Sequence, residues 1–258
     1  MIGFAKSALR YVLKSRGYVI VPASTIQPEF PLDFDPAMQN LCREVSPFTM
    51  TSPERVFALR QSVHHIIRNK IVGDIVECGV WKGGSMMVIA RTLMELGVTD
   101  RNLCLFDTFQ GMSEPTALDS SRDGESASDL LAMADKDTSW VWAYSPLEEV
   151  GKNVKGTGYP AERIAFVKGK VEDTLPANSP KQIALLRLDT DWYESTYHEL
   201  VHLYPNLSAG GILIIDDYGH WEGARKAVDQ YFQEQGLKPL LHRIDYTGRI
   251  CIKAPQEN

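Results

Sequence analysis

The feature that most constrains the fold is a series of five short apolar runs, separated by stretches long enough to form helices. The runs are apolar at almost every position, which is typical of strands buried on both faces of a parallel sheet. Stretches with helical spacing of apolar residues follow the last two runs. This alternation predicts an α/β fold with a doubly wound, mostly parallel sheet. The runs span residues 74–80, 102–109, 163–169, 183–189 and 211–217.

The last part of the chain, residues 240–254, has a different pattern. Its apolar and polar residues alternate more regularly, and Gly248 marks a turn within it. Alternation around a turn is typical of a β-hairpin. We therefore predict an antiparallel hairpin at one edge of the sheet.

Charge and hydropathy exclude several classes of partner. The formal net charge of −6 gives no general electrostatic reason to bind nucleic acid. No apolar run reaches the roughly 18 residues that a membrane-spanning helix needs.

The cysteines lack the spacing of a disulfide framework or a zinc site, so we predict buried free thiols in a reducing cytoplasm. They are Cys42, Cys78, Cys104 and Cys251.

The sequence predicts an N-terminal arm with a connector, residues 1–45, and a main domain, residues 46–258. The first 22 residues carry four basic side chains and no acidic one. We interpret this arm as a packing or dimerisation element; the alternative is loose attachment to an anionic membrane surface. A helix should begin after Ser52, a suitable N-cap that Pro53 follows.

Residues 110–160 form an insertion that is longer than a usual connection between a strand and a helix. Long insertions in compact domains tend to be lids or binding loops. Within this insertion, Trp140 and Trp142 either line a pocket for an organic substrate or anchor the insertion to the core. The sequence leaves both interpretations open.

The ends of the predicted strands indicate a ligand site, because open α/β sheets bind ligands beyond the carboxyl ends of their strands. The first strand runs into the glycine-rich loop ECGVWKGGS, which suits NAD, another nucleotide or S-adenosylmethionine. Glu77 in this loop disfavours a pyrophosphate and favours the cationic amino acid part of S-adenosylmethionine. Asp107 ends the second strand, where an acid accepts the ribose hydroxyls of an adenosine. Its alternative role is a turn cap.

Two further strands end in pairs of carboxylates, Asp189 with Asp191 and Asp216 with Asp217. Clustered carboxylates repel one another unless a cation lies among them. Carboxylate ligands suit a hard ion such as magnesium, and no matched set of histidines or cysteines indicates zinc. A metal and a base together would activate a poorly nucleophilic hydroxyl. The alternatives are helix N-caps for the first pair and a surface turn for the second.

Six motifs, spread over residues 45–252, together resemble the metal-dependent sugar O-methyltransferases of the macrocin O-methyltransferase (TylF) family. The resemblance implies a class I methyltransferase fold with a seven-stranded sheet, S-adenosylmethionine as cofactor, a divalent ion that is usually magnesium, and homo-oligomers. It implies a sugar hydroxyl as the methyl acceptor. The N-terminal 40 residues and residues 112–160 are where we expect the specificity for the acceptor to be determined. The motifs are FTMTSPER, GDIVECGVWKGGS, DTFQGM, RLDTDWYEST, LSAGGILIIDDYGHW and RIDYTGR.

The resemblance also implies roles for individual residues. Asp189, Asp216 and Asp217 would bind the metal, and Asp191 would be the general base. His220 is a second catalytic candidate, with a solvated loop histidine as the alternative. The candidate cofactor-binding residues are Thr49, Met50, Thr51, Ser52, Glu77, Gly79, Val80, Trp81, Gly83, Gly84, Ser85, Asp107, Thr108, Phe109, Gly169, Val171, Glu172 and Asp189.

The sequence therefore predicts a cytoplasmic enzyme that transfers a methyl group from S-adenosylmethionine to a sugar hydroxyl. A phenol or catechol acceptor, which would also chelate the metal, is the first alternative. An NAD-dependent oxidoreductase and a non-catalytic cofactor-binding protein are the others. Glu77 in the glycine-rich loop and the Asp216–Asp217 pair disfavour the oxidoreductase, and the presence of all four carboxylates disfavours the non-catalytic protein.

Overall fold

The computed structural model describes residues 30–255. The chain divides into two units after Asn40. Helix α2 (Pro36–Val45) begins next to Asp35, whose carboxylate accepts a 2.7 Å hydrogen bond from the Met38 amide. The basic arm predicted at the N-terminus lies outside the described residues. Its packing, dimerisation and membrane roles therefore stay predictions.

The main unit is built around a mixed seven-stranded sheet, which confirms the predicted fold class. The strand order is β3-β2-β1-β4-β5-β7-β6; β1 to β5 are parallel, while β7 pairs antiparallel with β5 and β6 with β7. The chain builds outward from β1 to β3 and then returns to add β4 on the other side of β1. The strands are β1 (Asp74–Cys78), β2 (Leu103–Asp107), β3 (Ile164–Lys168), β4 (Ile183–Leu188), β5 (Leu207–Ile215), β6 (His242–Arg243) and β7 (Arg249–Ile252).

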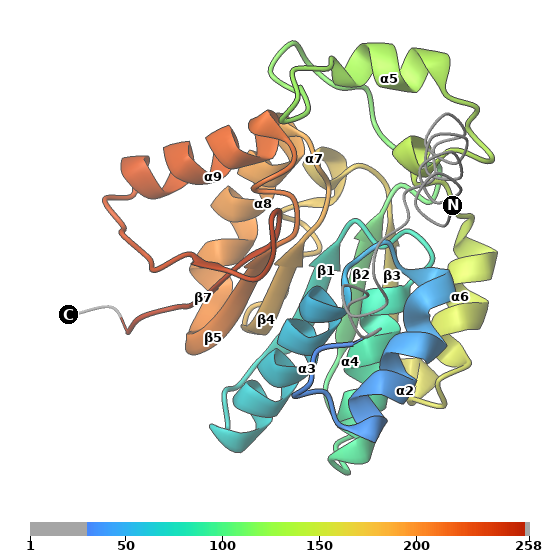
Figure 1. The fold of residues 1–258 in the computed structure, drawn as a ribbon. Helices are drawn as coiled ribbons and strands as arrows, with labels where there is room; N and C mark the ends of the chain where they lie inside the picture. The colour runs from blue at the N-terminus through green and yellow to red at the C-terminus, as the bar shows by residue number, and fades with distance from the viewer. Residues whose placement is uncertain (1–29, 256–258) are drawn as a thin grey trace, which may run out of the picture. The chain divides into compact units, whose positions relative to one another are not determined.

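Helices cover both faces of this sheet, as its buried strands require. Helices α3, α4 and α6 pack together on one side, and α8 and α9 pack together on the other (Figure 1). The α-helices are α3 (Pro53–Arg68), α4 (Gly84–Glu95), α5 (Ala127–Met133), α6 (Leu147–Lys155), α7 (Val171–Thr174), α8 (Tyr193–Leu203) and α9 (Glu222–Glu234). The short 3-10 helices are η2 (Ser46–Phe48), η3 (Trp140–Trp142), η4 (Ala161–Arg163) and η5 (Tyr204–Asn206).

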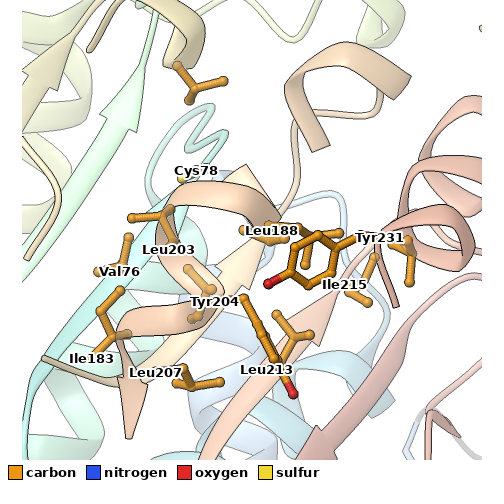
Figure 2. Packing of buried hydrophobic residues seen from close by; sticks show 14 of the residues in the cluster. Val76, Cys78, Ile183, Leu188, Leu203, Tyr204, Leu207, Leu213, Ile215 and Tyr231 are labelled. Carbon is orange, nitrogen blue, oxygen red and sulfur yellow. The ribbon is translucent and has the colours of Figure 1, made fainter. Parts of the chain in front are cut away.

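A buried apolar cluster joins β1, β4 and β5 to helices α8 and α9 (Figure 2). Aromatic rings close it on the helix side, where Tyr204 packs edge to face on Tyr231 and Phe232 at 5.7 and 5.2 Å between ring centroids. Each large apolar side chain buried in this way contributes roughly 1.5–3 kcal/mol. All four cysteines are free and buried, as predicted.

The insertion at residues 110–160 is less uniform than the sequence suggested. Its last helix, α6, packs against α4 and is an ordinary covering helix of the sheet. The earlier part, with α5 and η3, lies beyond the ends of strands β1 to β3 (Figure 1). Residues 110–146 are therefore the part of the insertion that faces the ligand end of the sheet.

Two capping predictions have different outcomes. Ser52 caps α3 as expected, since its hydroxyl accepts a 3.2 Å hydrogen bond from the Arg55 amide. Helix α8 has Trp192 at its N-cap and no capping side chain at that position, so Asp189 and Asp191 are not its N-caps.

Among the described residues, no helix is long and apolar enough to cross a membrane.

Candidate active site

The site lies where the sheet reverses its winding, between the neighbouring strands β1 and β4. In open α/β sheets this switch point forms the ligand crevice. The Asp189 amide donates a 2.8 Å hydrogen bond to the Cys78 carbonyl, so the loops after the two strands lie side by side. Gly79 is in the left-handed region at φ +79°, and a Cβ there would lie 2.0 Å from the Asp189 carbonyl oxygen. Only glycine allows this close approach.

A cleft at this point, here called the cofactor cleft, runs from the glycine-rich loop past Asp107 to Glu172. A second cavity of about 470 Å³, here called the acceptor cavity, lies beside the cofactor cleft. Asp189 and Asp191 line both of them. The predicted cofactor residues that line one or both are Thr49, Met50, Thr51, Gly79, Val80, Trp81, Gly84, Ser85, Asp107, Thr108, Gly169, Val171, Glu172 and Asp189. Four others, Ser52, Glu77, Gly83 and Phe109, line neither.

Asp107 has the capping role, which is one of the two roles that the sequence left open. Its carboxylate accepts hydrogen bonds from the amides of Val80, Trp81 and Phe109 at 2.7, 3.3 and 2.6 Å. These bonds fix the glycine-rich loop as a cap would. A carboxylate has about four acceptor positions, so about one is left for a ribose hydroxyl in the cleft.

Three of the four predicted carboxylates come together. Carboxylate oxygens of Asp189, Asp191 and Asp217 all lie within 4.8 Å of one another. Asp191 has a left-handed backbone at φ +69°, which is uncommon for a residue other than glycine. Asp217 does lie in a turn, since its carbonyl accepts from the amides of His220 and Trp221, but its side chain faces the other two carboxylates.

The electrostatics of this trio are unfavourable without a cation. Burial, the largest cause, and the nearby Asp189 and Asp216 together raise the pKa of Asp191 to about 7, although hydrogen bonds with Asp217 and Trp221 oppose the shift. Burial and neighbouring carboxylates also raise the pKa values of Asp189 and Asp217 well above the usual range of an aspartate. The Asp189 side chain nevertheless keeps 26% exposure, so it remains accessible from the cavities.

Asp216, the fourth carboxylate, is held by two arginines instead. One oxygen faces Arg187 at 2.7 Å, and the other forms an ion pair with Arg55 of α3. Arg55 also pairs with Asp245 at 3.0 Å, and the Ser52 hydroxyl donates to the same Asp245 oxygen. These contacts connect the start of α3 to the end of β5 and to the hairpin loop.

Arg187, to which the sequence assigned no role, forms ion pairs with three carboxyl groups, those of Glu77, Asp189 and Asp216. Its side chain is 3% exposed, and Nη1 donates to Glu77 and Asp189 at 2.6 and 2.7 Å. Burial raises the pKa of Glu77 to about 7 although the guanidinium opposes this shift. Glu77 is fully buried, contacts Arg187 and lines neither cavity, so its role as a cofactor ligand stays a prediction.

His220 lines the acceptor cavity together with residues that the sequence did not single out. Burial lowers the pKa of its imidazole, and Arg122 lowers it further, which favours the neutral ring. Its ring centroid is 4.9 Å from that of Trp221 and 6.1 Å from that of Tyr246. Tyr246 lies within the motif RIDYTGR and Arg55 within the motif FTMTSPER, which were the available signals for them, although the sequence assigned no role to either residue.

The insertion closes one side of both cavities. Asp119, which is 2% exposed, accepts 2.7 Å hydrogen bonds from the Tyr193 amide at the start of α8 and from the Thr116 amide. The Trp192 indole donates to the Ser113 carbonyl at 3.0 Å and packs edge to face on Trp221. The insertion is therefore bonded directly to the loops that carry Asp191 and Asp217.

Comparison with known proteins identifies the fold and the reaction class of this chain. The model of the macrocin O-methyltransferase (TylF) family matches residues 33–252. The chain belongs to this family. It is 36% identical over 200 residues to the demethyldecarbamoylnovobiocin O-methyltransferase of Streptomyces niveus, covering 78% of this chain and 73% of that protein. It is 33% identical over 240 residues to an 8-demethyl-8-(2,3-dimethoxy-alpha-L-rhamnosyl)-tetracenomycin-C 4'-O-methyltransferase of Streptomyces olivaceus, covering 93% and 88%.

A solved structure agrees with this assignment. The O-methyltransferase NovP superposes with a TM-score of 0.70 at 34% identity, over 81% of this chain and 83% of that one. The protein is thus an S-adenosylmethionine-dependent O-methyltransferase of the TylF family. This membership decides against the NAD-dependent oxidoreductase and the non-catalytic binding protein.

Proposed function

We propose that this methyltransferase acts on a sugar hydroxyl of a glycoside or glycan, with the help of magnesium. The observation that carries the proposal is the trio of Asp189, Asp191 and Asp217 at the border between the cofactor cleft and the acceptor cavity. Membership of a family with relatives named for rhamnosyl and other natural-product acceptors supports a sugar. A hydroxyl of this kind needs both a base and an electrostatic partner to react near neutral pH.

The residues around the trio fit a divalent cation. Two arginines, Arg55 and Arg187, pair with four carboxyl groups, and Asp191 and Asp217 beside them add two more, so carboxyl groups outnumber the arginines. The available ligands are all carboxylate oxygens, which suit magnesium. When bound, the ion would lower the pKa of an acceptor hydroxyl and hold that hydroxyl in place.

We assign Asp189 and Asp217 as metal ligands, because both the resemblance and the geometry support them. Asp216 is the third ligand that the resemblance implies. In its present contacts one of its oxygens faces Arg187 and the other Arg55, so the ion would have to take the place of Arg55. This exchange makes the assignment of Asp216 directly testable.

Asp191 is the proposed general base. Its carboxylate lies beside the two ligands and borders both cavities. In this position it would accept the proton that the acceptor hydroxyl loses when it is methylated. Asp107 would hold the ribose, the glycine-rich loop would admit the amino acid part of the cofactor, and the insertion would keep water out.

The test is turnover of S-adenosylmethionine to S-adenosylhomocysteine over a panel of aryl glycosides and catechols. Methylation of one or more glycosides is the expected result. Turnover confined to catechols would replace the sugar acceptor with the phenolic alternative. Cytoplasmic location and a homo-oligomer also remain proposals; sedimentation of the purified protein tests the second.

A further inference from the structure

The acceptor cavity has an aromatic wall that the proposed chemistry does not use. Trp140 of η3 and Tyr246 of the hairpin loop both line it, and they are 60% and 51% exposed. His220 is near both, with its ring centroid 6.4 Å from that of Trp140 and 6.1 Å from that of Tyr246. Large aromatic side chains usually bury most of their surface, so two half-exposed rings facing one cavity suggest a ligand that covers them.

Comparison of the two tryptophans in the insertion separates anchoring from binding. The Trp142 indole donates to the carbonyls of Leu131 and Ala134 at 3.2 and 3.1 Å and packs against the apolar cluster beneath the insertion. Trp142 is therefore the anchor. Trp140, two residues earlier, turns its ring toward His220 and the cavity. The two roles that the sequence left open are divided between the two residues.

Tyr246 has two neighbours that support its ring in the absence of a ligand. The Arg122 guanidinium carbon lies 5.0 Å from the centroid of the Tyr246 ring, and the His220 ring meets Tyr246 edge to face. The Arg122 amide in turn donates a 2.8 Å hydrogen bond to the His220 carbonyl. Preset rings lose little conformational entropy when a ligand stacks on them.

We propose that Trp140, His220 and Tyr246 form the acceptor subsite, and that Trp140 stacks on the apolar face of the pyranose ring to be methylated. The face of an aromatic ring carries partial negative charge and attracts the weakly positive C–H groups on one side of a sugar. The same cavity is lined by Asp189, Asp191 and Asp217, so a ring held there presents its hydroxyls to the carboxylates. This inference rests on the proposed function, because it names how the sugar is held.

The test compares Trp140→Ala, Trp140→Phe and a control, Met133→Ala, whose side chain in the same insertion is 86% exposed and outside the cavity. The probe is methyl α-L-rhamnopyranoside, added with saturating S-adenosylhomocysteine. Binding is followed by saturation-transfer NMR, which needs no turnover. Calorimetry with S-adenosylhomocysteine alone reports whether each variant keeps its cofactor site.

The expected result is a rhamnoside affinity about five- to tenfold weaker in Trp140→Ala. We expect affinities near that of the unmodified chain in Trp140→Phe and Met133→Ala, and unchanged cofactor affinity in all three. Saturation should reach the C–H protons of one sugar face more strongly than the other. Equal rhamnoside affinity in Trp140→Ala and Met133→Ala would overturn the proposal. Absence of rhamnoside binding to the unmodified chain would do the same. Failure of the proposed function would instead appear as glycosides that bind without being methylated.

Discussion

Arg187 and Asp216 form a buried ion pair at 2.7 Å, with side chains only 3% and 4% exposed. The same guanidinium also holds Glu77 and Asp189. Removing one partner of such a network leaves uncompensated buried charge, which typically costs about 3–5 kcal/mol. The pair therefore links the stability of the sheet to the geometry of the site above it.

Replacement of this arginine gives the first prediction. Arg187→Met should lower the free energy of unfolding by about 3–5 kcal/mol, measured by urea denaturation. Arg225→Met is the control, because Arg225 pairs with Glu222 on the surface, where both side chains are about half exposed. It should change stability by less than about 1 kcal/mol. Similar losses of unfolding free energy in the two variants would show that the buried network contributes no more to stability than a surface ion pair does.

The second prediction concerns the exchange of Arg55 for the ion at Asp216. Arg55→Met should tighten magnesium binding by about tenfold or more, measured by calorimetry, since a cation that competes for Asp216 is removed. Arg60→Met on the same helix is the control, because Arg60 pairs with Glu95.

A double-mutant cycle makes this test specific. In Arg55→Met combined with Asp216→Asn, the gain in magnesium affinity should disappear. If the gain persists, Asp216 is not a ligand, and Arg55 acts only through its charge.

The third prediction concerns the close approach of β1 and β4. Gly79→Ala should weaken S-adenosylhomocysteine binding by at least about tenfold, because its Cβ would collide with the Asp189 carbonyl. Gly97→Ala is a matched control: Gly97 also has a positive φ, at +69°, but a Cβ there meets nothing within 4 Å. Both variants pay the roughly 1–2 kcal/mol cost of a left-handed alanine. Equal cofactor affinities in the two would contradict the steric account.

The fourth prediction concerns the bonding of the insertion. Asp119→Ala removes the acceptor for the Tyr193 and Thr116 amides and should loosen the insertion. Hydrogen exchange in residues 110–146 should become faster, and the acceptor KM should rise with little change in cofactor affinity. Asp137→Ala, at an exposed position of the same insertion, should change neither. Unchanged exchange in Asp119→Ala would mean that other contacts hold the insertion.

Much of the fold was predictable from sequence because it depends on local patterns. The apolar runs located the five parallel strands to within a few residues, and the strand ends pointed to Gly79, Asp107 and the carboxylates. Ser52 was predicted as a cap from its neighbours alone. These features follow from spacing and residue type, which a single sequence contains.

The contacts that decide individual roles were not predictable, because they join distant parts of the chain. Arg55 meets Asp216 across 161 positions, and Arg187 meets Glu77 across 110. Asp119 accepts a hydrogen bond from the Tyr193 amide at the start of α8, 74 positions away along the chain. No local capping pattern predicts a partner at that distance. The division of roles between Trp140 and Trp142 also needed the folded insertion, since both residues look alike in sequence.

The measurement that tests the central claim most directly is methyl transfer to a glycoside acceptor with magnesium, with EDTA, and after magnesium is restored. The unmodified chain and Asp217→Asn should bind S-adenosylhomocysteine within a few-fold of each other. Asp100→Asn, at an exposed position, controls for loss of a carboxylate. The account predicts that EDTA abolishes turnover, that magnesium restores it, and that Asp217→Asn is inactive under every condition. Turnover that persists in EDTA, or in Asp217→Asn, would contradict a metal site at these carboxylates.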